Sequence, residues 1–106
     1  MSPAGNEETR AARELFIDID DAAVDLEQAI ARAQDGVPSA ADLAAIGDRI
    51  KSMVAERGTL NGADALIDAA DDAVTASEGG DVRRLVEAGV AAGEARQSLA
   101  ESIIGG

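Results

Sequence analysis

Acidic side chains are the groups in this sequence whose number and spacing could support chemistry. The chain has 21 Asp and Glu against nine Lys and Arg, and it contains neither His nor Cys. His is the commonest general base and transition-metal ligand, and Cys supplies thiolate nucleophiles and thiolate metal ligands. Any reaction would therefore depend on carboxylates, arginines and hydroxyls.

The acids are concentrated in two segments. Residues 7–34 carry eight acids against three Arg, and residues 61–78 carry five acids and no cation. Carboxylates of this kind are suitable ligands for Mg²⁺ or Ca²⁺, but a calcium loop places its acids around a central Gly, whereas these acids fall within helical segments. We therefore predict a solvated acidic face and no metal site. The acidic face comprises Glu14, Asp18, Asp21, Asp25, Asp64, Asp68, Asp71 and Asp72.

The remaining polar residues give no support for catalysis or for a cofactor. No Ser has a His partner or a Gly-x-Ser-x-Gly setting, so a nucleophile would lack its base. The chain has one Phe and no Trp or Tyr, which leaves no aromatic side chains to stack on bases, sugars or cofactor rings. We predict no catalytic residue, no cofactor and no small-molecule substrate, and hence a protein that is not an enzyme.

The charge and the hydropathy pattern also exclude partners. A net charge of −12 disfavours direct binding to nucleic acid or to an anionic membrane, because such binding needs clustered Lys and Arg. No run of 18 apolar residues is present, and the N-terminal residues lack the basic and then apolar pattern of a signal peptide. We therefore expect a soluble protein of cytoplasmic type without an export signal.

Apolar residues recur every three or four positions along most of the chain, which is the period of an amphipathic helix. The pattern predicts helices over residues 7–34, 39–57, 61–77 and 82–103, separated by turns that contain Gly or Pro. Short connections force neighbouring helices to run antiparallel. The predicted fold is all-α, an antiparallel up-down bundle of four helices, or alternatively three. Residues 1–6 are expected to form a flexible arm, and residues 7–104 a single domain.

Each predicted helix has an apolar stripe that should face the core. The helix over 39–57 is expected to open with a capping box formed by Ser39 and Asp42. Arg96 falls on the stripe of the last helix, where it needs a carboxylate partner or must extend its head into water. Gly89 and Gly93 are expected to allow close packing against Ala of a neighbour. The stripes include Leu15, Ile19, Ala22, Leu26 and Ala29; Leu43, Ile46, Ile50 and Met53; Leu60, Ala63, Ile67, Ala70 and Val74; and Leu85, Ala92 and Leu99.

The first helix also has apolar residues on the side opposite to its core stripe. Ile17, Val24 and Ala31 are spaced seven residues apart and point away from the Leu15–Leu26 stripe, where a surface helix should be polar. A helix that is apolar on two sides is usually covered on both. Together with Phe16 these residues form the predicted interface, although scattered surface apolar residues are an alternative explanation.

These patterns favour a non-enzymatic structural or interaction protein that assembles with itself or with a larger complex through its first helix. Abundant Ala, Gly, Asp and Arg with a single Lys is typical of a high-GC genome, and we expect a small virion component of a phage, such as a capsid or head-tail accessory protein. The alternative is an acidic inhibitor that mimics nucleic acid and captures a basic DNA-binding protein. An assembly protein should bind its partner through apolar contacts that tolerate salt, whereas an acidic inhibitor should bind its basic partner in a salt-sensitive way.

Overall fold

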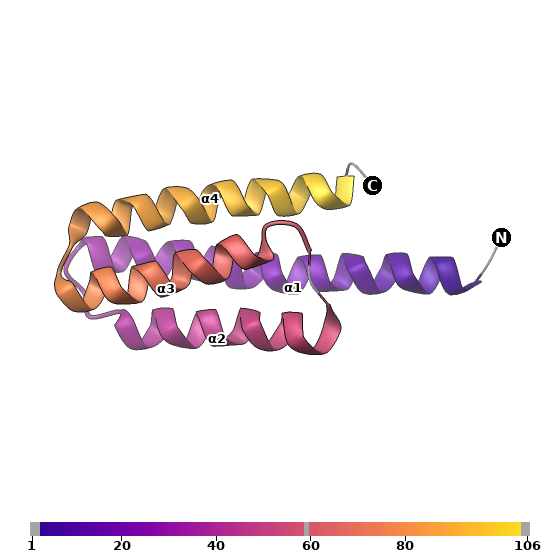
Figure 1. Cartoon of the computed structure of the whole chain (residues 1–106), viewed down its shortest axis with the longest axis horizontal. Helices are drawn as coiled ribbons and strands as arrows, with labels where there is room; N and C mark the ends of the chain where they lie inside the picture. The colour runs from indigo at the N-terminus through magenta and orange to yellow at the C-terminus, as the bar shows by residue number, and fades with distance from the viewer. Residues whose placement is uncertain (1–2, 59, 105–106) are drawn as a thin grey trace.

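The computed structural model describes residues 3–58 and 60–104, with side chains for residues 10–58 and 60–101. These residues form four helices, α1 (Pro3–Gln34), α2 (Ala40–Arg57), α3 (Ala63–Gly79) and α4 (Val82–Ile104), and no strand. The helices pack on one another along their lengths (Figure 1). The prediction of an all-α protein with four helices, rather than three, is confirmed.

The first helix begins earlier than the sequence pattern indicates. Residues 3–6, expected to belong to a flexible arm, are helical, and residues 1–2 lie outside the described residues. Pro3 suits the first helical position because it has no N–H to leave unsatisfied and its fixed φ is already helical. The N-terminal part of α1 projects past the ends of the other three helices (Figure 1).

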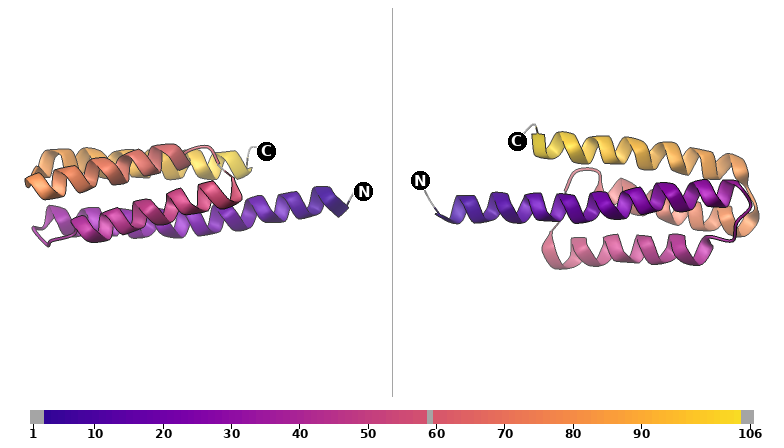
Figure 2. Two further views of the ribbon diagram at one scale, coloured as in Figure 1. Left: turned by 60° about the horizontal axis from the view of Figure 1, so that its bottom comes forward. Right: turned by 180° about the vertical axis from the view of Figure 1, so that it is seen from behind.

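The four helices form a flattened and elongated body, with extents of 54 × 23 × 16 Å. The α1–α2 and α3–α4 connections lie at one end of it and the α2–α3 connection at the other (Figure 1). Each helix contacts the next, α1 also contacts α4, and α1 and α3 touch across the middle, whereas the described parts of α2 and α4 do not meet. The cross-section is therefore a rhombus with α2 and α4 at its sharp corners. Figure 2 shows the four helices from two further sides.

Alanine makes up half of the core. Leu and Ile from α1, α2, α3 and α4 are interleaved with twelve buried Ala, so that the helices approach closely over small side chains. The stripes predicted for α1, α2 and α4 lie in or against this core. The buried set is Leu15, Ile19, Ala22, Ala23, Leu26, Ala29, Ile30, Ala33, Leu43, Ile46, Ile50, Ala63, Leu66, Ala69, Ala70, Ala73, Ala76, Leu85, Ala88, Ala92, Ala95 and Leu99.

The orientation of α3 differs from the prediction. Ile67 and Val74, predicted at the centre of its stripe, are only partly buried at the edge of the core, and Leu66 and Ala73 are buried instead. The reason is that α3 contacts all three other helices, so its inward side is wide and carries small residues. The larger β-branched side chains are displaced to the margin of this side.

The turns use glycine as expected and an aspartate caps α4, but the predicted capping box is absent. Gly36 has φ of +87°, and the N–H of Val37 donates to the carbonyl of Arg32, which closes α1. Asp81 accepts a hydrogen bond from the N–H of Arg84 and caps α4. The Ser39 hydroxyl, by contrast, donates to the carbonyl of Val37 and makes no cap bond, so the box with Asp42 is wrong.

Candidate functional site

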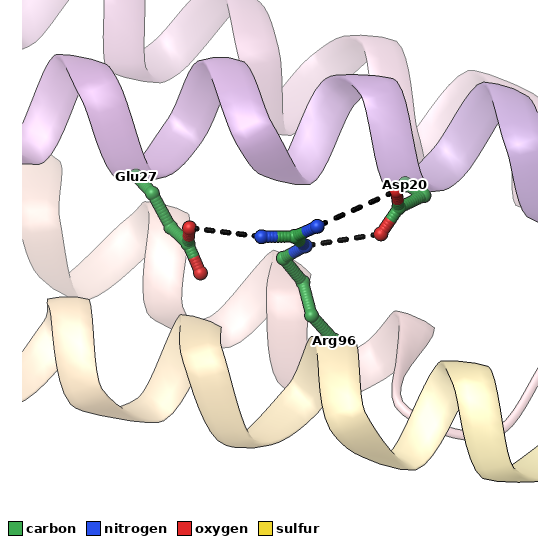
Figure 3. Close-up of polar contacts among 3 residues, drawn as sticks. All are labelled: Asp20, Glu27 and Arg96. Atoms are coloured by element: carbon green, nitrogen blue, oxygen red, sulfur yellow. Dashed lines mark hydrogen bonds and ion pairs between the residues drawn. The ribbon is translucent and has the colours of Figure 1, made fainter.

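The contact between α1 and α4 is organised around Arg96. Its guanidinium lies between two carboxylates of α1, with Nε 3.0 Å from Asp20 Oδ1 and Nη1 3.1 Å from Glu27 Oε2 (Figure 3). A third, longer bond joins Nη2 to Asp20 Oδ2 at 3.5 Å. The three side chains are about one-third exposed, so Arg96 has the carboxylate partner that its position requires and also reaches the solvent.

This arrangement keeps Arg96 charged. The hydrogen bond that Arg96 donates to Asp20 raises the pKa of Arg96 above its ordinary value, against a smaller opposing effect of burial, and the negative charges of Asp20 and Glu27 act in the same direction as the hydrogen bond. A group with no accessible titration is a poor acid or base. The cluster therefore fixes how α4 lies on α1 and has no evident reactive role.

The predicted acidic face is divided between the helix contacts and open surface. Asp18 pairs with Arg57, Asp25 with Arg49, and Asp71 with Lys51, so all three aspartates bind cations of α2. The other five members of the face make no ion pair with the side chains that the structure describes. These are Glu14, Asp21, Asp64, Asp68 and Asp72, and all are exposed.

A shallow hollow of about 410 Å³ lies beside these pairs, between α1 and α2. It is lined by Asp18, Asp21, Asp25, Arg49 and Met53. Arg49 points into the same region as the carboxylates and bonds to Asp25 at 3.0 Å, which offsets the charge that a cation would need. Within residues 10–58 and 60–101, no three carboxylates converge closely enough to hold a metal ion.

The four residues of the predicted interface are in different environments. Ile17 is 51% exposed, which is unusual for so large an apolar side chain, and Ala31 is also exposed. Val24 is half-buried. Phe16 packs against the core and is not available to a partner in the way that Ile17 is.

Helix α4 exposes a row of three valines that our sequence reasoning missed. Val82, Val86 and Val90 are 52%, 46% and 57% exposed, and their spacing of four residues places them on one side of the helix. They are exposed because α4 occupies a sharp corner of the rhombus and contacts only α1 and α3. The sequence shows the spacing of these valines on the side away from Leu85, Ala92 and Leu99, but their exposure depends on the position of α4 in the bundle.

Two glycines of α4 lie between this row and α1. A Cβ atom on Gly89 would be 3.5 Å from a methyl carbon of Ile30, and one on Gly93 would be 3.7 Å from Glu27 Oε1. The expected packing of these glycines against Ala is therefore wrong, since their neighbours are an Ile and a Glu. Gly89 and Gly93 therefore add no side chain of their own to the α1–α4 contact.

The α1 residues of the predicted interface border the same contact. Val24 follows Asp20 by four residues and Ala31 follows Glu27 by four, which places each about 40° around α1 from a residue that binds Arg96. We use the name seam surface for the exposed or half-buried apolar residues on this side of the molecule. It comprises Ile17, Val24 and Ala31 of α1 and Val82, Val86 and Val90 of α4.

The seam surface continues to the end of the molecule at which α1 meets α2. There Val37, which is 47% exposed, and Pro38 lie beside Val82 around a hollow of about 340 Å³. The floor of this hollow includes Ala33 and Leu85. Apolar groups thus extend from the α1–α2 turn along the outer side of α4.

Comparison with known proteins adds no further constraint. The chain matches no protein-family model, and no curated protein or solved structure matches it. Across the described residues, none of the helices combines the length and the apolar character that crossing a bilayer requires.

Proposed function

We propose that this chain is a non-enzymatic interaction protein, an antiparallel up-down helical bundle that assembles with protein through the seam surface. The observation that supports the proposal is the row of half-exposed Val82, Val86 and Val90 on the outer side of α4. Large apolar side chains that are adjacent and exposed mark binding surfaces in soluble proteins more often than single ones do. An accessory role in a phage particle is the setting that we propose for this assembly.

The first helix contributes to this surface through one side only. Ile17 and Ala31 are exposed and Val24 is half-buried, so these residues present apolar area on the side of α1 opposite its core stripe. Phe16 supports them from the core side. The proposed interface therefore extends beyond the first helix and includes the outer side of α4.

The charge distribution gives less support to an acidic inhibitor that mimics nucleic acid. Such a mimic needs a regular array of unpaired charges to match a phosphate-binding protein. Asp18, Asp25 and Asp71 are each paired with a cation of α2, which interrupts the array on both α1 and α3.

The proposal is tested by the size of the complex that contains the chain in an extract of its native source. The wild type should elute well above the 10.7 kDa of the monomer. Ile17→Asp combined with Val90→Asp should shift it to the monomer position, because two charges would be buried in an apolar contact. A matched control is Asp48→Asn on the exposed side of α2, which should elute as the wild type does. Elution of the wild type as a monomer would overturn the proposal.

A further inference from the structure

We infer that a second copy of this chain binds the α4 valine row, with the two α4 helices packed antiparallel about Val86. This inference deepens the proposed function and rests on it, because it names the partner of one part of the seam surface.

The position of α4 leaves the valine row open to a helix of another molecule. α4 contacts α1 and α3 but not α2, and no helix of the described chain covers the side that carries Val82, Val86 and Val90, which are about half exposed. A row with a spacing of four residues forms a ridge of the kind that packs into the groove of another helix. Gly89 and Gly93 have no side chains that project on the side of α4 toward α1, so the backbone of a second helix can approach closely there.

Among the faces through which two copies of this acidic chain could meet, the charges favour the α4 row over the acidic side of α1. Residues 82–90 hold Arg83, Arg84 and Glu87, one net positive charge in a chain of net charge −12. Two copies that met through the α1 side of the seam surface would bring Glu14, Asp18 and Asp21 close to the same acids of the other copy. Two copies that meet through α4 avoid this repulsion.

The antiparallel register follows from the positions of Arg83 and Glu87. With Val86 opposite Val86 of the other copy, Val82 lies opposite Val90, so all three layers are apolar. Arg83 and Glu87 lie on the same flank of α4, and in an antiparallel pair like flanks meet. Arg83 is then within about 3 Å, along the axis, of the level of Glu87 in the other copy. A parallel pair would instead bring the Arg83 flank to the glycine flank.

Arg83 and Glu87 have the freedom to exchange partners in this way. Within one copy they form only a 3.8 Å ion pair, with side chains 91% and 68% exposed. Such a pair adds little to the stability of the monomer. Since the contact is one helix per copy, smaller than a standard protein interface, we expect a weak dimer with a Kd on the order of 100 µM.

The absence of cysteine from the chain allows a direct test by disulfide trapping. Purified Val82→Cys and Val90→Cys chains are mixed and oxidised, and the disulfide-linked dimers are identified by mass spectrometry. Random pairing of equal amounts would give twice as much mixed 82–90 dimer as either homodimer. The antiparallel register predicts that the ratio of mixed dimer to homodimer is at least about fivefold higher than this, since the paired sites lie within disulfide reach. Val86→Cys alone should form a homodimer rapidly, and Ile17→Cys, a control of similar exposure, should form it slowly.

Sedimentation equilibrium supplies the test on the chain without added cysteine. The average mass should rise between about 10 µM and 500 µM, and more steeply in about 0.5 M salt than in 0.05 M, because screening reduces the repulsion between two acidic chains. Val86→Asp should weaken the dimer at least about tenfold, and Ile17→Asp should leave it unchanged. Arg83→Glu and Glu87→Arg should each weaken it, and the double exchange should restore it.

The outcomes separate this inference from the function on which it rests. A monomer at all concentrations would show that no second copy binds the valine row. Mixed dimers and homodimers in statistical proportion would show that the antiparallel register is wrong. If that monomer still enters a larger complex through the seam surface in extracts, the proposed function stands and the partner is a different protein. If neither association is found, both are wrong.

Discussion

Arg96 and Asp20 lie 76 positions apart in the sequence and join the last helix to the first through two hydrogen bonds. Glu27, two helical turns from Asp20, completes the cluster from the other side of the guanidinium (Figure 3). Because the three groups are only partly exposed, this cluster should contribute more to stability than a surface ion pair and less than a fully buried one.

The first prediction concerns this cluster. Arg96→Gln should lower the free energy of unfolding by about 1–2 kcal/mol, because it leaves two carboxylates of α1 without their cation. Asp20→Asn should cost more than Glu27→Gln, since Asp20 accepts two of the three bonds. Urea unfolding followed by circular dichroism measures all three variants. Equal losses for the two carboxylate variants, or none for Arg96→Gln, would contradict the geometry.

The second prediction is the pH dependence of the same contact. The pKa of Arg96 is raised in the folded chain, so its contribution to stability is fully present below the ordinary pKa of an arginine and is lost only as pH rises through the higher folded value. The difference in Tm between wild type and Arg96→Gln should therefore be constant from about pH 6 to pH 10. A difference that changes across this range would show that another titrating group controls the contact.

The third prediction separates two effects of glycine at positive φ. Gly62 and Gly36 have φ of +93° and +87°, but a Cβ on Gly62 would lie 2.4 Å from the carbonyl oxygen of Ala95, whereas nothing lies within 4 Å at Gly36. Gly36→Ala should cost about 1 kcal/mol for the backbone conformation alone. Gly62→Ala should cost about 3 kcal/mol or more, because α4 must move away from the α2–α3 connection. Chemical unfolding measures the free energy of unfolding of both variants. Equal losses for Gly36→Ala and Gly62→Ala would contradict this prediction.

The fourth prediction is a gain in stability. Gly89 and Gly93 are within α4 and a methyl group at either would be at ordinary contact distance, so replacement by Ala should stabilise the chain by about 0.5–1 kcal/mol each through helix propensity. Gly47→Ala in α2 is the matched control, because its Cβ would lie 3.2 Å from that of Ala70 and should gain less. Thermal unfolding would contradict this if Gly47→Ala gave the largest gain.

Much of the fold could be predicted because the helical period and the turn residues act locally. The stripes of α1, α2 and α4, the glycine at the end of α1 and the Asp81 cap all follow from neighbours within a few positions. The placement of Ile67 and Val74 could not be predicted in this way, since it depends on how many helices surround α3. Ser39 is a similar case, because its hydroxyl donates a hydrogen bond to the carbonyl of Val37 and does not cap α2.

The candidate surface was only partly predictable for the same reason. Ile17 and Ala31 were expected at the surface from the period of α1 alone. The exposure of Val82, Val86 and Val90 depends on α4 lying at a corner of the bundle, which the sequence of α4 does not encode by itself. The pairing of Asp18 with Arg57 and of Asp25 with Arg49 joins positions too far apart for any local rule to find.

The central claim, that the seam surface binds protein, is tested most directly by photo-crosslinking in the native source. A photo-reactive residue at Val90 or Ala31, both exposed, should give a discrete crosslinked protein band. The same residue at Asp48, on the exposed side of α2, should give none. Discrete crosslinks from Asp48 and none from Val90 or Ala31 would contradict the account.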